Sequence, residues 1–94
     1  MEMNTLRGKA EVMNIFVKGL KKLGITPEAV FRIADFAYKN YVESDYFREV
    51  LSNLKLGLNQ KEISCLIFIF DDAYSGFITR DDYYNSLNAY KMGV

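Results

Sequence analysis

Few side chains in this sequence can carry out bond-making chemistry. The 94 residues contain no histidine and one cysteine, Cys65, which lies in the apolar run of residues 63–70. Nucleophilic catalysis usually pairs a serine or cysteine with a histidine base, so the common catalytic pairs cannot be assembled. We therefore expect a binding protein with no catalytic residues, not an enzyme, and a Cys65 side chain that is buried as a small hydrophobic group.

The composition predicts one small domain without a strong electrostatic preference. Half of the residues are hydrophobic, which suits a single core at this length. Twelve Lys and Arg balance twelve Asp and Glu, so the basic surface that nucleic acids and anionic membranes require is not expected. No apolar run approaches the roughly 20 residues that span a bilayer. Because a lone cysteine cannot form an internal disulfide, we expect a cytoplasmic protein, with the cytoskeleton as one location there. The balanced charge and the short apolar runs predict that it binds neither nucleic acid nor membrane.

Apolar residues recur at the three- and four-residue spacing of amphipathic helices in five segments. After a flexible leader at residues 1–9, residues 10–94 are expected to form one domain, since no linker is long enough to divide them. The predicted helices cover, in order, residues 10–23, 27–34, 47–54, 60–70 and 83–90.

Local signals mark the ends of some of these helices. Gly24 is a typical helix terminator. Thr26 before Pro27 is a strong start signal, and Asn59 with Glu62 three residues later resembles a capping box.

The sequence contains an internal repeat. When the chain is shifted by thirty-six positions, residues 35–42 lie over residues 71–78, and three of the eight pairs are identical. The last three pairs are a turn-former, an aromatic residue and a β-branched residue in both copies. A second alignment stays open, in which Glu28 lies over Glu62 and the loop of the first copy is two residues shorter. Such a repeat predicts two copies of one helix-loop-helix unit.

The second copy has a recognisable order. A helix that ends in an apolar residue precedes a twelve-residue loop, residues 71–82, with Asp first, Gly sixth and a β-branched residue eighth. This arrangement resembles an EF-hand, and the pair resembles those of the calmodulin, centrin and myosin light-chain group. The resemblance implies an all-α, paired EF-hand-like helix-loop-helix domain with an additional N-terminal helix. Hand one would cover residues 26–56 and hand two residues 59–91.

The same resemblance implies specific roles for loop residues. Val42 and Ile78 occupy the eighth position of the two loops, where paired hands form a short antiparallel bridge. Calcium-binding positions in the second loop fall on Asp71, Ala73, Ser75, Phe77 through its carbonyl, Thr79 and Asp82. Ala73 supplies no oxygen, and Asp82 is shorter than the usual Glu, so at most one weakly bound calcium is expected there. The first loop, residues 35–46, has Lys39 and Tyr46 at ligand positions and is expected to hold no metal.

The helices of an EF-hand pair form a cup whose apolar floor stays closed or accepts an amphipathic helix. The first hypothesis is a regulatory or structural module that holds such a helix from a partner protein largely independently of calcium. The candidate contact residues are Phe31, Phe47, Leu51, Ile67, Phe70 and Leu87.

Several alternatives stay open. The chain could be a weak single-site calcium or magnesium sensor that works through the second loop, or a helical scaffold subunit without a groove. The helix at residues 10–23 is either a lid over the cup or part of the core. A second EF-hand lobe is expected to follow residue 94 if the chain is one half of a longer protein.

Overall fold

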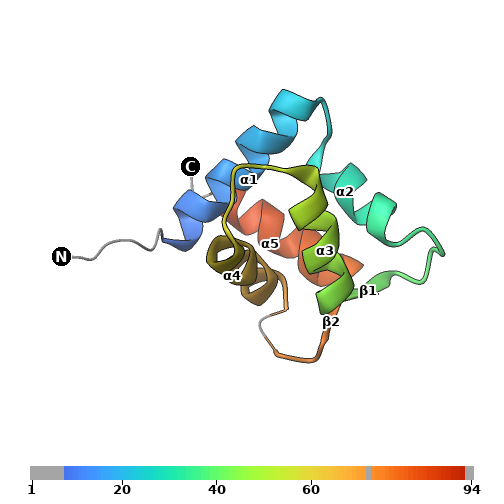
Figure 1. Cartoon of the computed structure of the whole chain (residues 1–94). Helices are drawn as coiled ribbons and strands as arrows, with labels where there is room; N and C mark the ends of the chain where they lie inside the picture. Colours follow the sequence, from blue (N-terminus) through green and yellow to red (C-terminus); the bar gives the residue numbers. More distant parts are fainter. Residues whose placement is uncertain (1–7, 72, 93–94) are drawn as a thin grey trace.

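The computed structural model describes residues 8–71 and 73–92 (Figure 1). Its elements follow the order α1 (Lys9–Leu23), α2 (Pro27–Ala34), β1 (Tyr41–Glu43), α3 (Ser44–Leu54), α4 (Gln60–Phe70), β2 (Phe77–Thr79) and α5 (Arg80–Met92). The described chain is therefore mainly helical, with a small two-stranded antiparallel sheet. Most of the expected leader at residues 1–9 lies outside the described residues, and Lys9 already belongs to α1.

The two predicted helix starts are confirmed by their hydrogen bonds. The Thr26 hydroxyl accepts a bond from the Ala29 N–H at 3.1 Å, directly before Pro27 opens α2. At the start of α4, the Asn59 side chain accepts from the Glu62 N–H at 2.8 Å, and the Glu62 carboxyl accepts from the Asn59 N–H at 2.9 Å. These bonds satisfy N–H groups that a helix start otherwise leaves without partners.

Helices α3 and α5 begin three residues earlier than their apolar patterns predicted, at Ser44 and Arg80. Each follows its strand without a break. The Ser44 N–H donates to the Gly76 carbonyl and the Arg80 N–H donates to the Asn40 carbonyl, both at 2.9 Å. Because these bonds fix the chain immediately after the sheet, the helices start there, one turn before the first buried aromatic residue of each helix.

The two loops correspond residue by residue at the repeat offset of thirty-six positions. Asp35 ends α2 and Asp71 ends α4, and their N–H groups donate to the preceding turn of helix at 2.7 and 2.8 Å. Helix α2 has 8 residues and α4 has 11, so the helices preceding the loops differ in length while the loops match. The alignment that shortens the first loop is therefore not the one that the structure adopts.

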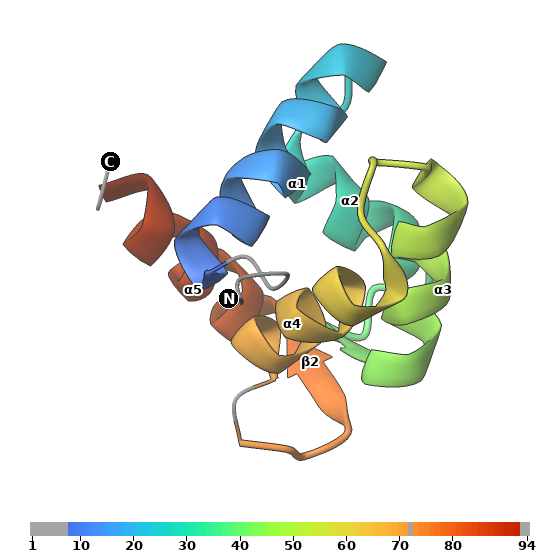
Figure 2. The same cartoon turned by 60° about the vertical axis from the view of Figure 1, so that its left-hand side comes forward.

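The core lies between α1, α3 and α4 on one side and α2 and α5 on the other, with α1 packed against α4 (Figure 2). A Cβ atom at Gly19 would lie 3.0 Å from the carbonyl oxygen of Leu56, so any larger residue there would require a small shift of the backbone. Helix α1 thus approaches the connection between α3 and α4 closely. Within residues 8–71 and 73–92, none of the helices has the length and apolar character needed to cross a membrane.

Candidate functional site

The second loop is organised around the carboxyl group of Asp71, whose residue is 7% exposed. One oxygen accepts bonds from the N–H and the hydroxyl of Ser75, at 2.9 and 3.0 Å. The other accepts from the Gly76 N–H and from the hydroxyl of Ser44, both at 2.9 Å. Ser44 belongs to the start of α3, so this last bond ties the second loop to the first helix-loop-helix unit.

These hydrogen bonds determine the ionisation of Asp71. Burial by itself raises the pKa of the carboxyl group, because it disfavours the charged form. The bonds from Ser75, Ser44 and Gly76 stabilise the charged form and together outweigh burial, so the pKa of Asp71 lies below its ordinary value of 3.8. Asp71 is therefore a charged and fully hydrogen-bonded anchor at neutral pH.

The structure brings some of the expected calcium ligands together. The Ser75 hydroxyl lies 3.0 Å from a carboxyl oxygen of Asp71 and 2.9 Å from the Phe77 carbonyl oxygen. Thr79 instead caps α5, because its hydroxyl accepts a bond from the Asp82 N–H at 3.1 Å. In the described part of the chain, no group of three or more Asp, Glu, His or Cys side chains is close enough to hold a metal ion. The oxygens that the structure brings together are those of the Asp71 carboxyl group, the Ser75 hydroxyl and the Phe77 carbonyl.

The first loop has the same backbone arrangement around Asp35. The two carboxyl oxygens of Asp35 accept bonds from the N–H groups of Lys39 and Asn40, both at 2.8 Å. Asn40 has φ 71° where its counterpart Gly76 has 87°, a left-handed conformation that asparagine tolerates better than most residues. The turn geometry is therefore common to both loops.

A cavity of about 440 Å³ opens within the first loop. All six positions that would hold calcium in a binding loop line it: Asp35, Ala37, Lys39, Tyr41, Glu43 and Tyr46. The rings of Phe36 and Phe77 complete its wall. We call this site the aromatic cavity. Sequence reasoning missed it, although the aromatic residues at ligand positions 41 and 46 were the available signal.

Val42 and Ile78 lie opposite each other in the antiparallel sheet, and both are buried. Beside them, the Tyr41 and Phe77 rings meet edge to face, with centroids 5.5 Å apart and planes at 88°. The sheet therefore joins the two loops through a buried aliphatic pair on one face and an aromatic pair that remains partly exposed.

The six candidate contact residues for a partner helix are all buried in this structure: Phe31, Phe47, Leu51, Ile67, Phe70 and Leu87. The rings of three of them, Phe31, Phe47 and Phe70, contact Tyr83, a fully buried residue that sequence reasoning did not single out as a contact residue. Its hydroxyl donates to the Pro27 carbonyl at 2.6 Å. Burial, with a smaller contribution from the charge of Glu28, raises the pKa of the Tyr83 hydroxyl far above its ordinary value. Tyr83 is thus a neutral core residue with a satisfied polar end.

Helix α1 covers this apolar face. Its Val12, Met13, Phe16 and Leu20 side chains are buried, and the Phe16 ring meets the Phe70 ring edge on, with centroids 6.0 Å apart. Cys65, expected to be buried, is half-buried.

A scan against protein-family models finds no matching family, and searches of the curated proteins and of the solved structures find no match.

Proposed function

We propose that this chain is an EF-hand-like protein-binding module that holds an amphipathic helix, and that its own α1 occupies the helix-binding face in the free protein. The observation that carries the proposal is the position of α1. Its buried residues Val12, Phe16 and Leu20 are spaced four positions apart and form one apolar stripe against α4. Amphipathic helices that lie in protein grooves use such a stripe of anchors.

The paired-hand part of the proposal is supported by the symmetry of the two loops. The Asp35 and Asp71 carboxyl groups accept equivalent N–H bonds, and the sheet places Val42 opposite Ile78. Two helix-loop-helix units related in this way bring four helices around one apolar face, which is the cup of an EF-hand pair.

The hydrogen bonds of the Asp71 carboxyl group support the proposal that the module binds its partner helix independently of calcium. Its carboxyl group already accepts four bonds from Ser44, Ser75 and Gly76, so the second loop is held in place by groups of the chain itself. A calcium ion would have to share these oxygens with their donors. These bonds support a module whose second loop is held in place by donors of the chain itself.

The test uses a peptide with the sequence of residues 9–23 as the probe, and compares the full chain with its Phe16→Ala variant. Removing the Phe16 ring weakens the docking of α1 by about 3 kcal/mol or more. An exchangeable α1 then leaves the face free more often, and calorimetry should show at least tenfold tighter peptide binding. Asn14→Ala, at an exposed position of the same helix, is the matched control and should bind like the parent chain.

The outcomes separate a lid from a core helix. If Phe16→Ala loses its helical circular dichroism and the peptide restores it, the face still accepts a separate helix, as proposed. If the variant unfolds and the peptide does not rescue it, α1 is an inseparable part of the core and the proposal is wrong. The same titrations with calcium and with a chelator should agree, whereas binding only in calcium would favour the sensor alternative.

A further inference from the structure

The side chains that line the aromatic cavity of the first loop differ from those at the equivalent positions of the second loop. At equivalent positions the first loop has Lys39 and Tyr46 where the second has Ser75 and Asp82. Side chains with small oxygen groups are therefore replaced by larger ones around the same turn. The backbone still forms the concave loop, since Asp35 holds it as Asp71 holds the other. The first loop therefore has the same turn but carries the Tyr46 ring where the second loop has the Asp82 carboxyl group.

The walls of the aromatic cavity are rings that remain open to solvent. Phe36 is 73% exposed, and Tyr41, Tyr46 and Phe77 are each between 41% and 42% exposed. The perpendicular arrangement of Tyr41 and Phe77 forms a corner with walls in two directions. Contiguous exposed aromatic surface of this kind is uncommon on proteins without a partner and marks interaction sites.

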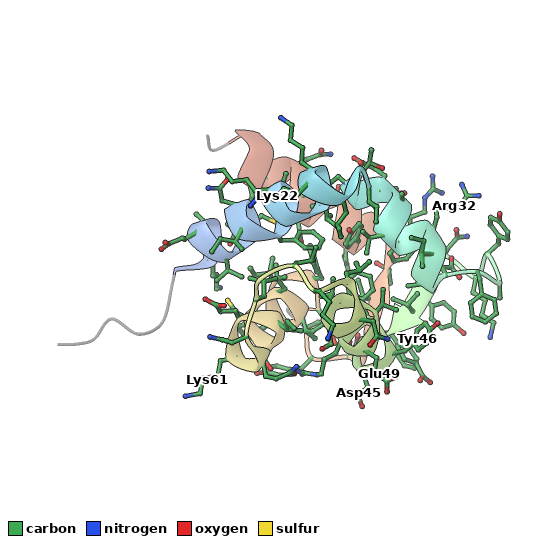
Figure 3. The ribbon with its side chains drawn as sticks, turned by 45° about the horizontal axis from the view of Figure 1, so that its top comes forward. Lys22, Arg32, Asp45, Tyr46, Glu49 and Lys61 are labelled. Carbon is green, nitrogen blue, oxygen red and sulfur yellow. The ribbon has the colours of Figure 1, made fainter. Side chains whose placement is uncertain are left out.

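The charges around the aromatic cavity are mostly negative. Asp35 and Glu43 line it, and Lys39 is its single basic residue. A smaller cavity of about 290 Å³ shares Glu43 and Phe77 with it and adds Asp45. Figure 3 shows Asp45 and Glu49 beside Tyr46 on the outer side of α3. A ligand that enters between these rings therefore meets acidic groups on one side of the entrance.

We propose that the aromatic cavity binds the cationic side chain of a lysine or arginine in a basic peptide of a partner protein. Aromatic faces attract ammonium and guanidinium groups, and nearby carboxyl groups add to that attraction. A bare metal ion does not fit, because two carboxyl groups among rings fall short of the oxygens that it takes. A neutral apolar ligand fits less well, since it would remove the exposed Glu43 carboxyl group from water without replacing its solvation.

Rings of this chain already hold cations in the described structure. The Arg32 guanidinium lies 4.8 Å from the Tyr38 ring centroid and donates to the Tyr38 hydroxyl at 2.7 Å. Arg80 lies 5.5 Å from the Tyr84 centroid. Tyr38 and Tyr84 are not part of the cavity wall, so these contacts leave the four cavity rings available.

The inference does not depend on the proposed role of α1. The aromatic cavity is formed by the first loop, the sheet and the start of α3, whereas α1 packs on α4 at the other side of the domain (Figures 1 and 2). A helix bound on the apolar face and a cation bound in the cavity would therefore be separate events, and either can fail without the other.

The experiment uses the full chain and a set of short Gly-Ser peptides that differ in one central residue. That residue is lysine, trimethyllysine, arginine, norleucine or glutamate, and binding is followed by calorimetry and by the ring signals of the tyrosines in NMR spectra. The cationic peptides should bind at least ten times more tightly than the norleucine and glutamate peptides. Added salt should weaken their binding.

Variants locate the binding. Tyr46→Ala should lower the affinity for the cationic peptides by about 3- to 30-fold, the range of one cation–ring contact, while Tyr46→Phe should retain most of it. Glu43→Gln should also weaken binding, and Lys39→Met should strengthen it severalfold. Tyr74→Ala is the matched control, because Tyr74 is an 80% exposed ring on the second loop outside the cavity, and it should change nothing.

Three results would overturn the proposal. The first is norleucine peptide binding as tight as lysine peptide binding, which would make the site a neutral apolar surface. The second is an equal loss in Tyr46→Ala and Tyr74→Ala, which would place binding elsewhere. The third is no measurable binding of any cationic peptide to a chain whose circular dichroism is that of the folded protein.

Discussion

Asp35 and Asp71 hold the two loops through matching bonds, at 2.8 Å to Lys39 and Asn40 and at 2.9 Å to Ser75 and Gly76. Beyond these backbone donors the loops differ. Asp71 also accepts from two hydroxyl groups, whereas Asp35, within the described residues, accepts only the two N–H groups. Backbone N–H groups and one carboxyl group are therefore enough to form the turn. The other side chains of the two loops can therefore differ, both in how much they stabilise the fold and in what they bind.

The first prediction contrasts the two anchors by alanine substitution. Asp71→Ala leaves the N–H groups of Ser75 and Gly76 and the hydroxyl of Ser44 without their acceptor, and should lower the free energy of unfolding by about 3 kcal/mol. Asp35→Ala leaves only two N–H groups without their acceptor and should cost about half as much. Urea denaturation of both variants measures the difference. Equal losses would mean that the hydroxyl donors add nothing to the second loop.

The second prediction concerns acid. The pKa of Asp71 is lowered in the folded protein, so its contribution to stability is present above the ordinary value of 3.8 and is lost as the pH falls through the lowered value. The parent chain should therefore approach the stability of Asp71→Asn as the pH falls through that window. Urea midpoints of both proteins across an acid series measure this approach. A stability difference that is the same at every pH would contradict the lowered pKa.

The outline of the fold follows from local sequence signals. Thr26 and Asn59 mark helix starts by chemistry that acts within three residues, and the apolar spacing sets the helix faces. The repeat offset predicted which loop residues correspond, and Val42 lies opposite Ile78. These features depend on neighbours in the chain or on similarity between its two halves, which a sequence displays directly.

Other features depend on contacts between distant segments and are not visible in the sequence. Whether α1 covers the apolar face follows from how Phe16 meets Phe70, fifty-four positions away. The Ser44 hydroxyl reaches Asp71 from another helix, and no periodicity indicates that bond. The aromatic cavity likewise needs Phe77 from β2 to complete a wall whose other residues come from the end of α2, the first loop and α3. Such sites become visible only when the tertiary arrangement is known.

The smallest expected effect concerns the side-chain hydrogen bond that the first helix-loop-helix unit makes to the second. It tests whether the equivalent residue of the second unit contributes as much. Ser44 donates its hydroxyl to Asp71 across the pair, while Arg80, the residue at the equivalent position, lies over the Tyr84 ring. Ser44→Ala should therefore destabilise the chain by about 1 kcal/mol, and Arg80→Ala by less than about 0.5 kcal/mol.

A double-mutant cycle then isolates the bond between the two units. In the Asp71→Ala background the Ser44 hydroxyl has already lost its acceptor, so Ser44→Ala should add almost nothing to the loss in urea denaturation. Arg80→Ala should cost the same in both backgrounds, because its ring contact lies outside the second loop's hydrogen bonds. Full additivity of Ser44→Ala with Asp71→Ala would show that the bond contributes no stability. The two loops would then be joined by the sheet alone, and their different side chains would matter for binding but not for holding the pair together.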